Sequence, residues 1–121
     1  MRRFALAFLF LSCSTNAAVP MPKPHPGDLG TYTLLAEVRR VDGIVETVHR
    51  RSGPAGETWS WNEIRCGARQ YREMAVAYDT PENPKGPATP WTDIVNGSSK
   101  SMLVRFVCTR KASGVPELGK L

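Results

Sequence analysis

The fold is decided by residues 32–52, YTLLAEVRRVDGIVETVHRRS. Both halves of this stretch are rich in aliphatic and β-branched residues, and Asp42-Gly43 separates them. Asp-Gly between two such runs is the strongest short-range signal of a β-hairpin, because the turn needs the positive φ angles that glycine tolerates. We therefore predict two antiparallel strands, residues 32–41 and 44–52, joined by a two-residue turn.

The two-residue turn predicts a register for this hairpin. Arg39 would lie opposite Glu46, and Ala36 would lie opposite His49. One of the two faces is the better candidate for the core. The other face carries Glu37 and is predicted to be partly exposed to solvent. The predicted core face consists of Leu34, Ala36, Val38, Val45, Thr47 and His49.

The same register gathers arginines on the hairpin and predicts a candidate anion-binding patch. The alternative is an ordinary solvated face, with local pairs to Glu37, Glu46 and Glu73. The candidate patch consists of Arg39, Arg40, Arg50 and Arg51.

Two further strands follow the hairpin. Residues 57–66 alternate aromatic and polar side chains, and residues 69–78 alternate aromatic and β-branched ones. For the second segment, a helix over residues 69–77 is the alternative. Within the third strand, Trp59 and Trp61 are candidate exposed aromatics. We expect one of them in the core and the other at the surface, unless a bulge buries both.

The C-terminal part of the chain predicts a short helix over residues 100–109, after a proline-rich loop at 79–90. Leu103, Phe106 and Val107 follow helical spacing, and Ser98 or Ser99 is suited to cap the helix. Apolar residues also alternate with other residues from Met102 to Cys108, so a strand is the alternative for this segment. The predicted fold class is α+β, mainly antiparallel β: a small single-disulfide sheet with a short C-terminal helix.

Residues 1–18 have the pattern of a secretory signal peptide. Arg2 and Arg3 precede an apolar run, residues 4–11, and small residues follow it. Eight apolar residues span about 12 Å as a helix, too little for a bilayer of about 30 Å. Acylation at Cys13, as in a lipoprotein, is the alternative.

Removal of this leader would leave a proline-rich, exposed N-terminus, a single globular domain and a tail. We predict a periplasmic or secreted protein of the outer envelope, with no transmembrane segment. The expected boundaries are 19–30, 31–110 and 111–121.

Of the three cysteines, Cys66 and Cys108 remain after the leader is removed. In an oxidising compartment such a pair forms one disulfide. Two cysteines and two histidines in no ligand spacing predict no metal site, and the chain predicts no cofactor.

The chain has 121 residues, of which 41% are hydrophobic and 22% charged, which fits one small folded domain. Its formal net charge is +5, and two of these charges belong to the leader. This mildly basic surface excludes a strongly cationic nucleic-acid coat protein and predicts no specific nucleic-acid partner.

The order of features from Asp42 to Cys108 resembles the cryptic neisserial protein-like family of exported Gram-negative proteins. The sequence EIRCGARQY, residues 63–71, is the most specific part of this resemblance. A looser similarity links the late cysteine pair and the terminal apolar helix to surface-adhesin E-like domains. The first resemblance implies an envelope location, pairing of Cys66 with Cys108 and no known catalytic residues, and the second implies binding of host or matrix proteins.

These observations predict an exported envelope protein that acts as a binding or structural module, and no enzyme. Its partner is an unknown envelope or host protein, with weak contact to an anionic ligand as a further option; the oligomeric state stays open. One alternative is a surface adhesin. A second is a small ribonuclease-like hydrolase with His49, Glu63, Arg65 and Arg51 around an anionic substrate, although the chain contains no recognised catalytic motif.

Overall fold

A computed structural model describes residues 18–110 of the chain. The predicted signal peptide with Cys13, and the predicted tail at 111–121, lie outside the described residues. Six antiparallel strands form one sheet, in which each strand pairs with its neighbours in the sequence, and one helix follows them. The elements are β2 (Val19–Met21), β3 (Thr31–Arg39), β4 (Ile44–Gly53), β5 (Gly56–Arg65), β6 (Gln70–Tyr78), β7 (Thr92–Asp93) and α1 (Ser99–Thr109).

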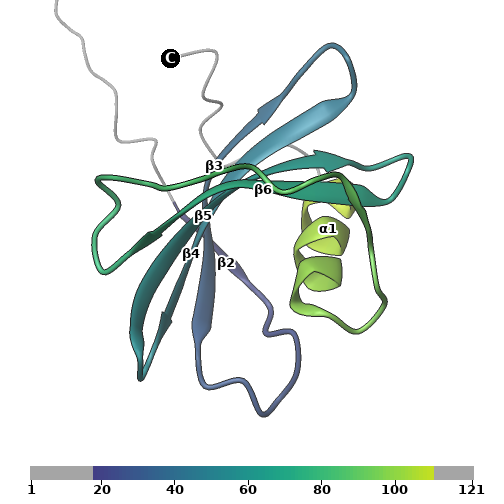
Figure 1. The fold of residues 1–121 in the computed structure, drawn as a ribbon. Helices are drawn as coiled ribbons and strands as arrows, with labels where there is room; N and C mark the ends of the chain where they lie inside the picture. Colours follow the sequence, from purple (N-terminus) through teal and green to yellow (C-terminus); the bar gives the residue numbers. More distant parts are fainter. Residues whose placement is uncertain (1–17, 111–121) are drawn as a thin grey trace, which may run out of the picture.

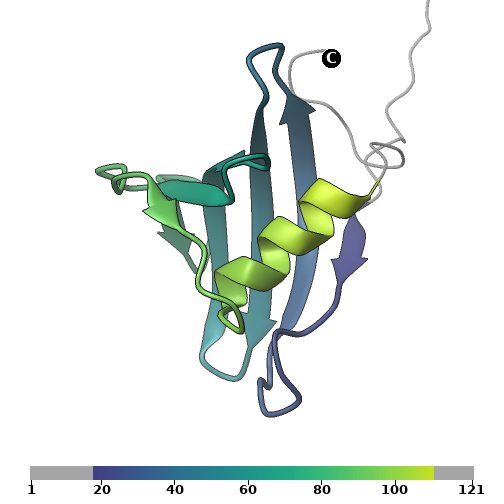
Figure 2. The same cartoon turned by 90° about the vertical axis from the view of Figure 1, so that its right-hand side faces the viewer.

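The helix packs across one face of a twisted sheet (Figures 1 and 2). The core lies between them, where Leu34, Val45 and Ile64 from the strands meet three apolar residues of α1. Those three residues, Leu103, Val104 and Val107, are at most 2% exposed. This arrangement confirms the predicted fold class, the strand over residues 70–78 and the C-terminal helix.

The start of α1 follows from a local signal in the sequence. The hydroxyl oxygen of Ser98 accepts a hydrogen bond from the backbone N–H of Ser101 at 3.1 Å, which satisfies one donor of the first turn. The apolar residues then fall on one stripe that faces the sheet. Of the two serines proposed as caps, Ser98 is the one used.

The sheet has two faces with different surroundings. We call the side packed against α1 the helix face, and the opposite side the open face, because no helix of the described residues covers it (Figure 1). The open face includes Val38, Glu46, Val48, Arg50, Trp59, Trp61, Glu63 and Arg72, as the strand register and the alternation of side chains require.

The proline-rich N-terminal segment is not wholly exposed, contrary to the prediction. Its first residues form β2, an edge strand paired with β3, and Met21 is 8% exposed within the core. Pro20 is tolerated there because an edge strand does not need an N–H donor on its outer side. Within residues 18–110, the sheet therefore begins at Val19 and not at residue 31.

The predicted register of the hairpin is wrong by one residue. The Arg40 N–H donates to the Ile44 carbonyl at 2.9 Å, and the Gly43 N–H donates to the Arg40 carbonyl at 3.1 Å. These bonds enclose a three-residue loop, a form in which a turn is followed by a residue in the left-handed region. Gly43, with a φ of 89°, is that residue. As a consequence Arg39 lies opposite Val45, and not opposite Glu46.

A bulge in β3 also changes which side chains face the core. The pairing shifts between Leu34 and Ala36, so Leu34 lies opposite His49 and Ala36 lies opposite Val48. The extra residue at this point reverses the alternation. Leu34 and Glu37 therefore share the helix face, although a regular strand would place them on opposite faces.

Replacement of Gly43 by valine is expected to destabilise the protein by more than about 1 kcal/mol. A Cβ at this position would meet no atom within 4 Å, so the cost comes from the positive φ and not from a clash. Urea unfolding measures the change. Gly67→Val is the matched control, because a Cβ there also meets nothing within 4 Å and no positive φ is involved. An equal loss in both variants would contradict the prediction.

The predicted disulfide is present. Cys66, directly after β5, is bonded to Cys108 in the last turn of α1. The bond therefore ties the helix to the sheet that it covers. Within residues 18–110, no helix is both long and apolar enough to cross a membrane.

Candidate functional site

An apolar pocket lies on the open face of the sheet. Its walls are Val48 of β4, Trp61 of β5 and Met74 of β6, and its volume is about 190 Å³. Val48 and Trp61 are directly opposite each other in the ladder, and the pairing of β5 with β6 shifts beside Trp61, where Met74 is the extra residue. We call this hollow the Trp61 pocket. The remaining lining residues are Glu46, Thr47, Asn62 and Glu63.

The two tryptophans of β5 differ in burial, as predicted, but they do not point to opposite faces of the sheet. Residues two apart in a strand point to the same side, so Trp59 and Trp61 both lie on the open face and neither reaches the core under α1. Trp59 is 8% exposed, between Arg50 and Ala77 of the neighbouring strands. Trp61 is half-buried. Of the two candidates, only Trp61 is available as a contact residue.

Paired charges border one end of the Trp61 pocket. The Arg40 guanidinium contacts Glu46 and Glu63, each at 3.1 Å, and Arg72 binds the other oxygen of Glu63 at 2.8 Å. Arg40 also pairs with Asp42 at 2.7 Å. Glu63 therefore has an arginine on each carboxylate oxygen, although it is only 8% exposed. The acidic groups at this end are neutralised within the protein itself.

Trp91 extends this end of the open face. Its ring lies between two guanidinium groups, with Arg65 at 3.8 Å and Arg72 at 4.7 Å from the ring centroid. Such cation–π contacts hold the loop before β7 against the sheet. The sequence offered no signal for this contact, because Trp91 lies outside the predicted strands.

The four arginines of the predicted anion-binding patch are not brought together. Arg39 lies opposite Val45, whereas Arg50 and Arg51 lie about 17 Å further along β4. They also divide between the two faces, since Arg50 is on the open face and Arg51 is beside Asp28 and Tyr32. The predicted gathering of these arginines depended on a register that the structure does not have.

Three of these arginines are bound to carboxylates. Arg39 pairs with Glu37, Arg51 pairs with Asp28 at 2.8 Å, and Arg40 belongs to the cluster described above. The hydrogen bonds from Tyr32, the Gly30 N–H and Arg51 hold the pKa of Asp28 well below its ordinary value. Arg50 differs, because no ion pair joins it to a carboxylate of residues 18–110. Its Nε is buried without a hydrogen-bond partner, as is Nε of Arg39.

A second group of polar residues lies on the helix face, under the first turns of α1. The Asn62 amide donates to Nδ1 of His49 at 3.2 Å, and Lys100 donates to the Asn62 oxygen at 3.3 Å. Lys100 also pairs with Glu73 at 3.2 Å. Burial, and to a lesser extent the charge of Lys100, lower the pKa of His49 to about 3. His49 is therefore neutral at physiological pH.

The residues of the hydrolase alternative are separated by the sheet. His49 and Arg51 lie on the helix face, whereas Glu63 and Arg65 lie on the open face. His49 is 7% exposed and is held by Asn62. A base and an acid on opposite sides of one sheet cannot act on the same substrate atom. This arrangement disfavours the predicted constellation.

Protein stability is expected to fall as the pH is lowered from 7 to 5, by about 2 kcal/mol from His49 alone. His49 stays neutral in the folded protein, whereas in the unfolded chain it gains a proton below its ordinary pKa of 6.5. Its contribution is complete above pH 6.5 and is lost as the pH falls toward 3. Urea unfolding at both pH values measures the loss, which should become less than half as large in His49→Gln.

The sequence did not identify Val48 and Met74 as candidate site residues. Val48 is placed beside Trp61 by the short turn at Pro54-Ala55, which pairs Gly53 with Gly56. A two-residue turn at this point was a usable signal for that pairing. Met74 is placed by a bulge, for which no local pattern exists.

Among residues 18–110, no group of three or more His, Cys, Asp or Glu residues is placed to hold a metal ion. No protein-family model, curated protein or solved structure matches this chain.

Proposed function

We propose that this protein is an exported binding module of the bacterial cell envelope, and that the Trp61 pocket receives an apolar side chain of a protein partner. The pocket is the observation that carries the binding part of the proposal. It combines an indole, a thioether and an aliphatic wall on a sheet face that no helix of the described residues covers. Aromatic side chains in such positions dominate the energetics of protein interfaces.

The size of the pocket favours one side chain over a cofactor or metabolite. Sites for drug-sized ligands have volumes of roughly 300–1,000 Å³, whereas this pocket has about 190 Å³. Its rim of paired charges from Arg40, Glu46 and Glu63 resembles the polar rim that surrounds an apolar centre in protein interfaces. A protein partner is therefore the best-supported occupant.

Two observations support export. The bond between Cys66 and Cys108 is of a kind that persists in oxidising compartments and is rare in the cytosol. The N-terminal sequence, with Arg2 and Arg3 before an apolar run, has the pattern of a leader. The resemblance of residues 63–71 to the cryptic neisserial protein-like family agrees with this location.

Met74→Lys is expected to reduce capture of envelope proteins at least about tenfold, because it places a charge in the pocket. The bait is the full chain, expressed with its own leader and purified in its oxidised form from the periplasm. Captured proteins are compared with those of the unaltered protein by quantitative mass spectrometry. Val95→Lys is the matched control, since Val95 is 69% exposed and lies outside the pocket.

Equal capture by the unaltered protein and Met74→Lys would refute the proposed binding surface. Export would be refuted if the expressed protein were found only in the cytosol and still carried residues 1–18. Equal melting temperatures of the two lysine variants would show that any lost capture comes from the pocket and not from unfolding.

A further inference from the structure

We infer that Arg50 and the Trp61 pocket form one two-point site, which takes a partner segment carrying an apolar side chain and an aspartate or glutamate two residues away. The inference rests on the proposed function, because it specifies the chemistry of the segment that the pocket receives. It is carried by the position of Arg50, by its missing partner and by the spacing between the two points.

Arg50 lies next to the pocket on the same face of the sheet. Val48 and Trp61 form the pair of opposed residues at the pocket, and Arg50 and Trp59 form the next pair on that face. Same-face residues of one strand are about 7 Å apart along it. Arg50 and the apolar hollow therefore occupy adjacent positions on one face of the sheet.

Arg50 has a charge that the described residues do not neutralise. On the same face, Arg40 and Arg72 are bound by Glu46 and Glu63. In contrast, Nε of Arg50 is buried without a hydrogen-bond partner, and no ion pair of Arg50 exists within residues 18–110. Only Nε of this guanidinium is buried without a partner, and the Arg50 side chain as a whole is half-buried. A carboxylate that reaches the remaining N–H groups of Arg50 therefore gains a charge-assisted hydrogen bond.

The distribution of charge around the pocket determines at which end an acidic group of the bound segment would lie. At the end of the pocket near Glu46 and Glu63, both carboxylates are already neutralised. Arg65 lies further from the pocket on this side, where its guanidinium contacts the Trp91 ring and donates to Gln70. At the opposite end, Arg50 attracts an anion. An extended peptide places side chains i and i+2 on one side, about 7 Å apart, which matches the spacing of Val48 and Arg50 along β4.

Three short peptides test the inference against the full oxidised chain. The acetylated and amidated peptide SLSES places glutamate two residues after leucine, SLSQS replaces it with glutamine, and SLSSE moves it one residue further. Affinity is measured by titration calorimetry. SLSES is expected to bind at least about tenfold more tightly than either SLSQS or SLSSE.

Protein variants assign this preference to Arg50. Arg50→Met keeps the apolar stem and removes the charge, so it is expected to bind SLSES and SLSQS equally, while its melting temperature stays close to that of the unaltered protein. Arg50→Lys is expected to keep part of the preference, because the charge remains without the guanidinium fork. Arg105→Met is the matched control, since Arg105 is exposed on α1, and it is expected to keep the full preference.

The outcomes separate this inference from the proposed function. Equal affinity of SLSES and SLSQS for the unaltered protein, or a preference for SLSSE, would overturn the two-point site. If Met74→Lys then loses both peptides, the pocket still stands as the binding surface. If Met74→Lys binds both peptides as well as the unaltered protein, or if no peptide binds at about 1 mM, the proposed function and the two-point site both fail.

Discussion

Reduction of the bond between Cys66 and Cys108 is expected to lower the melting temperature by about 10–25 °C. The bond closes a loop of 42 sequence positions, for which the chain-entropy estimate is about 4 kcal/mol. Native disulfides of small domains typically contribute about 2–4 kcal/mol. For a domain of this size, each kcal/mol moves the melting temperature by about 4–8 °C.

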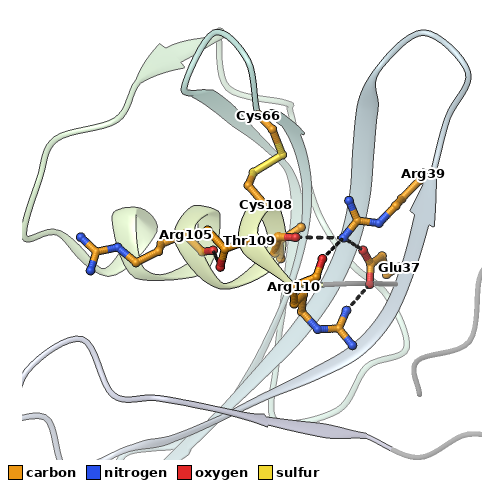
Figure 3. Close-up of a disulfide and its surroundings, with 8 residues drawn as sticks. Glu37, Arg39, Cys66, Arg105, Cys108, Thr109 and Arg110 are labelled. Atoms are coloured by element: carbon orange, nitrogen blue, oxygen red, sulfur yellow. Dashed lines mark hydrogen bonds and ion pairs between the residues drawn. A yellow bond between two sulfur atoms is a disulfide. The ribbon is translucent and has the colours of Figure 1, made fainter. Parts of the chain in front are cut away.

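The position of the bond explains why its loss should affect the whole domain. Cys108 lies in the last turn of α1, and Figure 3 shows the disulfide linking the helix to the end of β5. Detachment of the helix would expose Leu34 and Ile64, which are both 0% exposed in the folded protein. The core has no second helix within residues 18–110 to replace α1.

Circular dichroism during heating, with and without reductant, measures the shift. Intact-mass analysis after alkylation is the control, because protein from the periplasm should take up no label at Cys66 or Cys108 until it is reduced. Two labelled cysteines before reduction would contradict the prediction. A shift of less than a few degrees would show that packing alone holds the helix.

Removal of both cations from Glu37, in the double variant Arg39→Met with Arg110→Met, is expected to cost about 3–5 kcal/mol. Glu37 is 1% exposed, and each of its oxygens lies 2.5 Å from one of the two arginines. Figure 3 shows this cluster at the C-terminal end of α1. Without the arginines, the carboxylate would be buried without a counter-charge.

The same cluster attaches the end of the helix to β3. Nη2 of Arg39 donates to the Val107 carbonyl at 2.9 Å, which is one of the carbonyls left without a partner at a helix C-terminus. Arg110, directly after α1, reaches back to Glu37. The ion pairs and the disulfide therefore hold the two sides of the last turn of α1.

Addition of Glu37→Met to the double variant is expected to recover most of the lost stability. Replacement of all three members by apolar residues removes the buried charge together with its partners, which is often neutral or stabilising. Urea unfolding at neutral pH compares the two variants. A triple variant no more stable than the double one would show that the cost does not come from an unpaired Glu37.

The kind and order of most elements could be predicted from local signals in the sequence. Alternating residues predicted β4, β5 and β6, Asp42-Gly43 predicted the hairpin, and Ser98 with the stripe that includes Leu103 predicted α1. The cysteine pair could be predicted because only two cysteines follow the predicted leader. These signals depend on neighbouring residues alone, so they do not require knowledge of the fold.

The register of the strands could not be predicted in the same way. Asp-Gly fits both two-residue and three-residue loops, and the two forms differ by one residue in pairing. A one-residue difference exchanges the two faces of a strand. The predicted pairing of Arg39 with Glu46, and the predicted patch of four arginines, were both wrong for this reason.

The sequence by itself determined that this chain forms a β-rich domain with one helix and one disulfide, because alternation, turn residues and helix caps act over a few residues. Only the tertiary structure decided which side chains meet. The bulge in β3 turns Glu37 toward α1, and the bulge in β6 places Met74 beside Trp61. Bulges depend on how strands fit a twisted sheet and its helix, and local sequence does not encode that fit. For this reason the Trp61 pocket and the unpaired Arg50 emerge only from the folded chain.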